Sequence, residues 1–301
     1  MPAPKPESHP SPVPGSQSAL ELSALDGTRL AADLFAPAQA PQAAVVIASA
    51  MGVPRRLYRA FARYLAQGGI AALTFDYRGI GGSGTASDRR AQLHDWGEQD
   101  LGGALRFLSE RFPSVPHLYF GHSVGGQLAG LAPGSERLRA LVMVGAQHGY
   151  WRNFGGLKQA AMFAFWYGSP LVVRAFGRLP MKRLVGGEDL PAGVALEWAR
   201  WGRHPDYLWS YASARGGASY PRIQAPLLSY AISDDGYAPV RSVEALNRLY
   251  TAARTELRLV EPRSQGVKSI GHFGFFRERF ADPLWREALA WMLKEAQGPG
   301  V

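Results

Sequence analysis

Apolar and polar residues follow a regular rhythm along most of the chain. Six runs, most of them rich in apolar residues, predict strands: residues 43–48, 70–75, 117–120, 138–144, 226–232 and 256–260. Apolar residues also recur at helical spacing in four stretches: residues 54–65, 95–108, 124–131 and 240–250. A last helix is expected to start at Asp282-Pro283. Strands that alternate with helices form a mostly parallel sheet with helices on both faces, so the pattern predicts an α/β fold.

The chain ahead of this pattern looks different. Residues 1–18 are rich in proline and serine and contain no apolar stretch, which is typical of a disordered tail and not of a signal peptide. Residues 19–25 and 29–35 follow, joined by Asp26-Gly27, and predict a hairpin. The ordered part of the chain is therefore expected to begin at residue 19.

Residues 147–220 also depart from the rhythm. The stretch is rich in aromatic residues and interrupted by glycines and prolines, and it predicts helical pieces at 157–167, 170–176 and 192–201. We interpret it as a helical cap inserted into a core made of residues 19–146 and 221–297. A cap this apolar favours a ligand with an acyl or aromatic group over a sugar. It carries nine basic and four acidic residues. This excess fits attraction of an anionic substrate or a membrane surface, but a solvated outer face is the favoured interpretation.

The composition narrows the classes of protein that the chain can be. With 301 residues and 47% hydrophobic content, it can bury a large core. It has no cysteine, which excludes disulfides, thiolate metal sites and cysteine nucleophiles. The net charge of +9 comes from dispersed arginines and not from a basic run, so no nucleic-acid partner is expected. The longest apolar stretch, residues 43–53, is too short to cross a bilayer, and we expect no stable membrane insertion and a cytoplasmic location.

A candidate nucleophile stands where a predicted strand passes into a predicted helix. The sequence there is Gly121-His122-Ser123-Val124-Gly125, the pattern G-x-S-x-G. At such a junction the serine occupies a very tight turn and its hydroxyl is exposed at the tip. Side chains at Gly121 and Gly125 would collide with neighbouring backbone in so tight a turn. Ser123 then requires a base, an acid and an oxyanion hole from the rest of the chain.

The base and the acid have candidates in two later loops. A serine hydroxyl is a weak nucleophile at neutral pH and needs a base that is itself oriented by an acid. Asp234 and Asp235 follow the predicted strand 226–232 after a single residue, Ser233. The proline at 239 favours Asp235 by its spacing while leaving Asp234 as a competitor. His272 follows the last predicted strand and is the candidate base. The order Ser, Asp, His along the chain is the one that the strand–turn–helix version of the triad requires.

These motifs together resemble the α/β-hydrolase-fold serine hydrolases, and the likeness covers nearly everything after the tail. The family's acid motif D-x-x-[VA]-P corresponds to Asp235-Gly236-Tyr237-Ala238-Pro239, and its late G-H dipeptide corresponds to Gly271-His272. Its loop D-x-R-G-x-G-x-S corresponds to residues 76–83. The histidine-containing elbow followed by Gly126 is similar to that of monoglyceride lipases and of serine aminopeptidase-like hydrolases.

The resemblance implies a two-step acyl transfer on a small-molecule acyl substrate, without a metal or another cofactor. It also implies an oxyanion hole made of the backbone N–H groups of Met51 and Val124. Many members have His-Gly before the oxyanion residue, whereas this chain has Ser49-Ala50-Met51-Gly52. Because backbone N–H groups bind the oxyanion, the change of side chain does not by itself remove the hole.

Several weaker signals compete with this interpretation. Residues 79–84 match the dinucleotide pattern G-x-G-x-x-G, but they follow a middle strand and do not open a helix, so a structural turn is favoured. Asp76 and Arg78 are expected to fix that glycine-rich loop (residues 76–84) through ionic hydrogen bonds. His122 is expected to pack beneath the elbow. Four other histidines show no paired spacing with carboxylates that indicates a metal site: His94, His117, His148 and His204.

Two alternatives to an ester hydrolase (or a thioester or amide hydrolase) remain open from the sequence. An acyltransferase would use the same triad with an alcohol or amine in place of water. A non-catalytic binding protein on the same fold would usually lack a triad residue, and all three are present here.

Overall fold

The computed structural model describes residues 15–88, 90–184, 187–215 and 218–298. Its main sheet has eight strands in the order β1-β2-β4-β3-β5-β6-β9-β10. The bounds of β1 to β6, β9 and β10 are Gln17–Ser23, Arg29–Phe35, Ala43–Ala48, Ile70–Phe75, His117–His122, Ala140–Val144, Leu227–Ile232 and Thr255–Val260. Strand β2 runs antiparallel to β1 and β4, and the other neighbouring pairs are parallel. The mostly parallel α/β sheet that the sequence predicts is confirmed.

The central strands separate two apolar cores. Successive side chains of a strand point to opposite faces of its sheet. In β3, Val45 and Ile47 belong to one core, whereas Val46 and Ala48 belong to the other. All residues of β3 and β4 are buried, as expected for strands that are covered on both faces.

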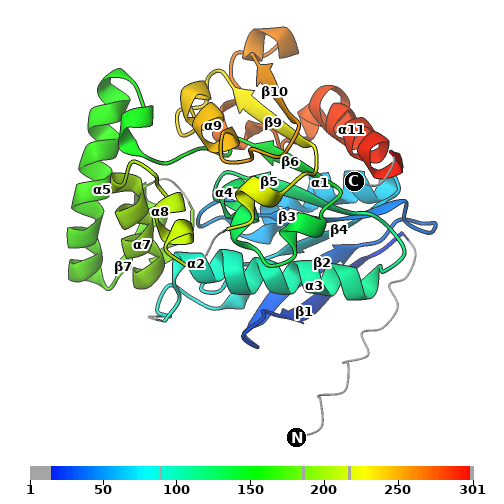
Figure 1. Cartoon of the computed structure of the whole chain (residues 1–301), viewed down its shortest axis with the longest axis horizontal. Helices are drawn as coiled ribbons and strands as arrows, with labels where there is room; N and C mark the ends of the chain where they lie inside the picture. The colour runs from blue at the N-terminus through cyan, green and yellow to red at the C-terminus, as the bar shows by residue number, and fades with distance from the viewer. Residues whose placement is uncertain (1–14, 89, 185–186, 216–217, 299–301) are drawn as a thin grey trace, which may run out of the picture.

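Helices cover both faces of the sheet (Figure 1). On the face of Val45, α1 and α11 contribute Phe61 and Met292 to the core. On the opposite face, α3 and α4 contribute Leu108 and Leu128. The helices of the core region are α1 (Arg59–Gln67), α2 (Leu93–Asp95), α3 (Gly102–Arg111), α4 (Val124–Leu128), α9 (Val240–Asn247), α10 (Gly271–Gly274) and α11 (Arg286–Gln297).

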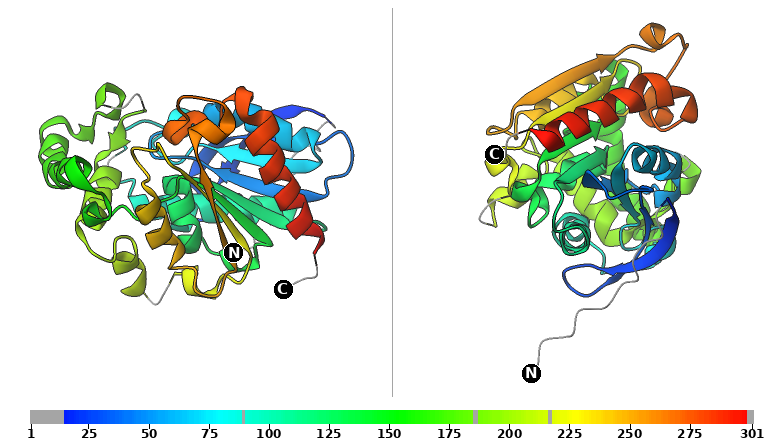
Figure 2. Two further views of the ribbon diagram at one scale, coloured as in Figure 1. Left: turned by 90° about the horizontal axis from the view of Figure 1, so that it is seen from above. Right: turned by 90° about the vertical axis from the view of Figure 1, so that its right-hand side faces the viewer.

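Residues 147–220 form a separate group of helices to one side of the sheet (Figures 1 and 2). We call this segment the cap. Its helices are α5 (Gly156–Phe176), α6 (Met181–Leu184), α7 (Ala192–Arg203) and α8 (Trp209–Ser213). A short antiparallel ribbon, β7 (Arg178–Leu179) with β8 (Leu190–Pro191), was not expected from the sequence.

One expectation for the cap is wrong. The sequence predicts two helices separated near Pro170, but α5 continues through this proline. A proline inside a helix removes one hydrogen bond and costs about 3 kcal/mol. Trp166 and Val173 lie on either side of it and are both buried, and their packing offsets that loss.

The ends of two other elements also differ from expectation. The predicted tail overlaps the sheet, because β1 already begins at Gln17, and residues 1–14 of that tail lie outside the described residues. The helical stretch expected at residues 95–108 instead begins after Gln92, and the Gln92 backbone N–H donates to Asp95 Oδ2 at 2.9 Å within a capping box. None of the helices in the described ranges is both long and apolar enough to cross a membrane.

Candidate active site

The turn between β5 and α4 holds Ser123 in a strained backbone conformation, with φ 53° and ψ −119°. A non-glycine residue in such a region costs about 1–3 kcal/mol and persists only where its surroundings impose it. Here the Ser123 N–H donates to the carbonyl of Val144 at 3.0 Å, which ties the turn to β6. A Cβ atom on Gly125 would overlap the carbonyl oxygen of Ala48. The turn is as tight as the G-x-S-x-G pattern predicts.

Asp235 and His272 form a buried pair. Asp235 Oδ2 lies 2.7 Å from His272 Nδ1, and the two residues are 3% and 7% exposed. The other carboxylate oxygen, Oδ1, accepts the backbone N–H groups of Tyr237 and Ala238 at 2.7 and 3.0 Å. The carboxylate is therefore held with one oxygen aimed at the ring. This arrangement favours a proton on His272 Nδ1 and leaves Nε2 free to accept one.

Asp234, the competing acid, points elsewhere. Its carboxylate accepts the Ser269 hydroxyl at 2.6 Å and the backbone N–H groups of Ile270 and Gly271, each at 3.0 Å. Desolvation alone would raise the pKa of Asp234, but these hydrogen bonds outweigh it and lower the pKa below its usual range. Asp234 thus clamps the loop that carries His272, a role that the sequence did not indicate.

His122 lies beneath the turn, fully buried, and connects two loops of the site. The Tyr58 hydroxyl accepts the Ala50 N–H at 2.8 Å and lies 2.8 Å from His122 Nδ1. His122 Nε2 lies 2.9 Å from the carbonyl oxygen of His272. A carbonyl only accepts, so Nε2 carries the proton and Nδ1 accepts from Tyr58. Burial, reinforced by the nearby His272 ring, lowers the pKa of His122 well below its usual range, which keeps this neutral tautomer in place.

The two expected oxyanion donors come from two different segments, the start of α4 and the loop after β3. Val124 is the first residue of α4, and the N–H of a first helical residue has no carbonyl within its helix to bond. Met51 lies in the loop after β3, and among the described residues its backbone N–H donates to no protein acceptor. The Met51 side chain borders the same cavity as Ser123. Both N–H groups are thus compatible with binding an oxyanion.

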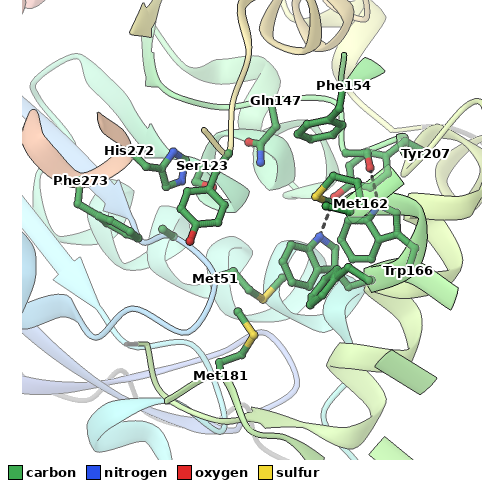
Figure 3. A pocket seen from close by; sticks show the side chains of 16 residues that line it. Met51, Ser123, Gln147, Phe154, Met162, Trp166, Met181, Tyr207, His272 and Phe273 are labelled. Carbon is green, nitrogen blue, oxygen red and sulfur yellow. Dashed lines mark hydrogen bonds between the residues drawn. The ribbon is translucent and has the colours of Figure 1, made fainter. Parts of the chain in front are cut away.

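Ser123 and His272 open onto a cavity of about 310 Å³. Figure 3 shows them on one side of it, with Trp166 and Tyr207 on the opposite side. Within the described residues, no Asp, Glu, Lys or Arg side chain lines the cavity. Its large side chains are mostly apolar: Met51, Phe154, Met162, Phe165, Trp166, Met181, Trp198, Tyr207, Tyr237 and Phe273. Such a site fits a substrate with a large uncharged, apolar portion.

The glycine-rich loop is held by carboxylates and not arranged to bind a phosphate. Its Gly82 N–H donates to Asp76 Oδ2 at 2.8 Å. Arg78 is nearly buried, with Nε 2.7 Å from Asp100 Oδ1 and Nη1 2.8 Å from Asp26 Oδ2. Asp76 and Arg78 therefore fix the loop through ionic hydrogen bonds, each with a different partner.

The comparisons with known proteins agree with this fold. The family model described as serine aminopeptidase, S33, matches residues 39–185. The chain has the α/β-hydrolase fold. As predicted from its motifs, this α/β hydrolase is a serine hydrolase.

Several solved structures share the fold of this α/β hydrolase. A soluble variant of monoglyceride lipase from Saccharomyces cerevisiae, in complex with a substrate analogue, is 16% identical with a TM-score of 0.66, covering 99% of this chain and 100% of that chain. A lipase in an open form is 18% identical with a TM-score of 0.62, covering 94% and 100%. A thermostable carboxyl esterase from Bacillus coagulans, in complex with glycerol, is 14% identical with a TM-score of 0.60, covering 93% and 99%. At these identities the likeness shows the common fold.

One contact between the cap and the core of the α/β hydrolase could not be read from the sequence. His94, for which no acidic partner was expected, has its Nδ1 2.8 Å from Glu197 Oε2 of α7. Its ring also stacks on that of Tyr211, with centroids 4.8 Å apart. The two members of the ion pair are 103 residues apart in the chain, and no local signal links them.

Proposed function

We propose that this α/β hydrolase cleaves a carboxylic ester, or a related thioester or amide, with Ser123 as nucleophile, His272 as base and Asp235 as acid. One observation carries the proposal. A buried imidazole whose Nδ1 lies 2.7 Å from Asp235 shares a cavity with a serine in the strained elbow conformation. Activated serine nucleophiles have this relation between nucleophile, base and orienting acid.

In the first half of the proposed reaction, His272 Nε2 takes the proton of the Ser123 hydroxyl as the oxygen attacks the substrate carbonyl carbon. Asp235 stabilises the imidazolium that forms. The Met51 and Val124 N–H groups donate to the oxygen that becomes negatively charged, and losing one such donor typically costs about 10²–10³ in rate. The intermediate collapses to an acyl-Ser123, and the departing alkoxide takes the proton from His272.

In the second half, water attacks the acyl group. His272 Nε2 accepts a proton from this water and then returns it to the Ser123 oxygen as the acid is released. The apolar cavity without a charged side chain supports an ester whose buried portion is uncharged, such as an acyl chain or an aromatic group.

The test combines active-site labelling with turnover. We expect a fluorophosphonate probe to label the folded protein at Ser123, and para-nitrophenyl esters of increasing acyl length to be hydrolysed. Both signals should disappear in Ser123→Ala, with the thermal unfolding midpoint as the check on folding. A folded protein that is not labelled would refute the proposal. Product analysis with an added alcohol distinguishes hydrolysis from acyl transfer.

A further inference from the structure

An amide side chain interrupts the apolar wall of the cavity. Gln147 follows β6, is only 7% exposed, and lines the cavity together with Ser123 and His272. Its side-chain nitrogen faces the open space (Figure 3). Among the hydrogen bonds of the described residues, this nitrogen donates none. A nearly buried donor without a protein acceptor is available to a ligand.

The hydrogen bonds behind Gln147 determine which of its atoms faces the cavity. Trp198 Nε1 can only donate, and it donates to the Tyr207 hydroxyl at 2.9 Å. Tyr207 therefore gives its own proton to Gln127, so the Gln127 atom 2.8 Å away is the carbonyl oxygen Oε1. Gln127 Nε2 then donates to Gln147 Oε1 at 3.1 Å. Because the Trp198 indole donates the first of these hydrogen bonds, the NH₂ group of Gln147, and not its oxygen, faces the cavity.

This chain of hydrogen bonds is rigid. Gln127 and Tyr207 are 1% and 0% exposed, so neither side chain has room to turn over. Apart from Ser123, Tyr207 is the only non-glycine residue with positive φ in the described part of the chain, at 51°. Backbone strain of this kind persists where the surroundings impose it. The Gln147 donor is therefore presented in a fixed direction, which is the condition for selecting between ligands.

We propose that Gln147 determines substrate specificity by donating a hydrogen bond to an uncharged oxygen of the substrate, such as an ether, a hydroxyl or a second carbonyl. The assignment rests on the proposed function, since it concerns the same cavity. In the free protein, water can satisfy the NH₂ group, and a substrate that displaces this water must replace its hydrogen bond. A carboxylate is disfavoured because no cationic side chain of the described residues lines the cavity to neutralise it.

The test uses esters that differ by one oxygen. Para-nitrophenyl octanoate is compared with analogues in which one chain methylene is replaced by an ether oxygen, at each position in turn. Butyl octanoate and methoxyethyl octanoate make the same comparison on the alcohol side. We measure kcat/KM for the unmodified chain and for Gln147→Leu. Affinity is measured in the Ser123→Ala background, with and without Gln147→Leu, by displacement of a fluorescent apolar probe.

For each protein, the preference is the kcat/KM or the affinity for the oxygen-containing ester divided by that for its all-carbon counterpart. Comparing this preference between the unmodified chain and Gln147→Leu isolates the hydrogen bond, because differences in ester reactivity and in ligand hydration cancel. For at least one oxygen position we expect Gln147→Leu to reduce the preference for the oxygen-containing ester about tenfold or more. Met162→Leu, which changes the cavity wall without a polar atom, should leave the preference unchanged.

The assignment would be overturned if the preferences of Gln147→Leu stayed within about twofold of those of the unmodified chain, at every oxygen position and in both the acyl and the alcohol series. The affinity measurements do not depend on turnover. If the unmodified chain hydrolyses none of the esters, the proposed function fails, whereas the binding ratio still decides the role of Gln147.

Discussion

Replacing each of the adjacent aspartates, Asp234 and Asp235, by asparagine separates the proposed acid from the loop clamp. In Asp235→Asn the two backbone N–H groups that now bind Oδ1 will select the amide oxygen, since an NH₂ group cannot accept them. The amide nitrogen is then forced toward His272 Nδ1, where it donates. The imidazole proton must move to Nε2, and His272 can no longer accept the proton of Ser123.

The expected loss of activity in Asp235→Asn follows from this change of the His272 tautomer. A histidine held in the wrong tautomer loses about 10⁴ in kcat, equivalent to about 5.4 kcal/mol of transition-state stabilisation. Asp234→Asn has a different consequence. The single carbonyl oxygen of the asparagine still accepts hydrogen bonds from the Ser269–Gly271 loop, but one of the hydrogen bonds to the carboxylate and its negative charge are lost. We expect a loss of about 1–2 kcal/mol in the free energy of unfolding and a decrease in kcat/KM of about tenfold or less.

The assay is hydrolysis of a para-nitrophenyl ester by both variants, together with urea unfolding of each. Asp235→Asn should remain folded and nearly inactive, whereas Asp234→Asn should be less stable and still active. The reasoning would be refuted if Asp235→Asn kept more than about one tenth of the activity, or if Asp234→Asn lost as much as Asp235→Asn.

Three further predictions concern the framework of the site. In Gly125→Ala the new Cβ overlaps the Ala48 carbonyl, and thermal unfolding should show a loss of about 1–3 kcal/mol; an unchanged midpoint would mean that the turn can open. Tyr58→Phe leaves the Ala50 N–H and the buried His122 Nδ1 without their partner, so urea unfolding should show a loss of about 1–3 kcal/mol in the free energy of unfolding. A variant as stable as the parent would contradict these two hydrogen bonds of Tyr58. Burial alone lowers the pKa of His94, but the hydrogen bond and charge of Glu197 outweigh it and raise the pKa above its usual value. The resulting stabilisation is complete below pH about 6.5 and is lost as the pH rises through the raised pKa, so unfolding measured across this range should show a decline that His94→Phe abolishes.

The strands and the order of the motifs were predictable because their signals are local. Residues 43–48 and 70–75 form strands with the predicted bounds, since a strand that is covered on both faces is apolar at nearly every position. The tight turn at Ser123 was likewise readable, because only glycine fits at Gly125. These features depend on a residue and its immediate neighbours in the chain.

Local signals failed where packing from a distance overrode them. Pro170 predicts a break, but the burial of Trp166 and Val173 keeps α5 continuous. Two aspartates stand side by side, and the sequence could only favour Asp235 by its spacing to a proline. The fold decides which of them contacts His272, because the direction of each carboxylate depends on the loops that surround it.

The sequence by itself determined the fold class, the enzyme class and the candidates for nucleophile, base and acid. Each of these rests on a short motif or on the periodicity of apolar residues, and both can be recognised in the linear sequence. The tertiary structure decided what surrounds the reacting groups. The cavity and the donor of Gln147 arise from side chains in the core and the cap that are far apart in the chain, through Gln127, Tyr207 and Trp198. No pattern along the chain encodes that meeting, because it depends on how the cap packs against the sheet.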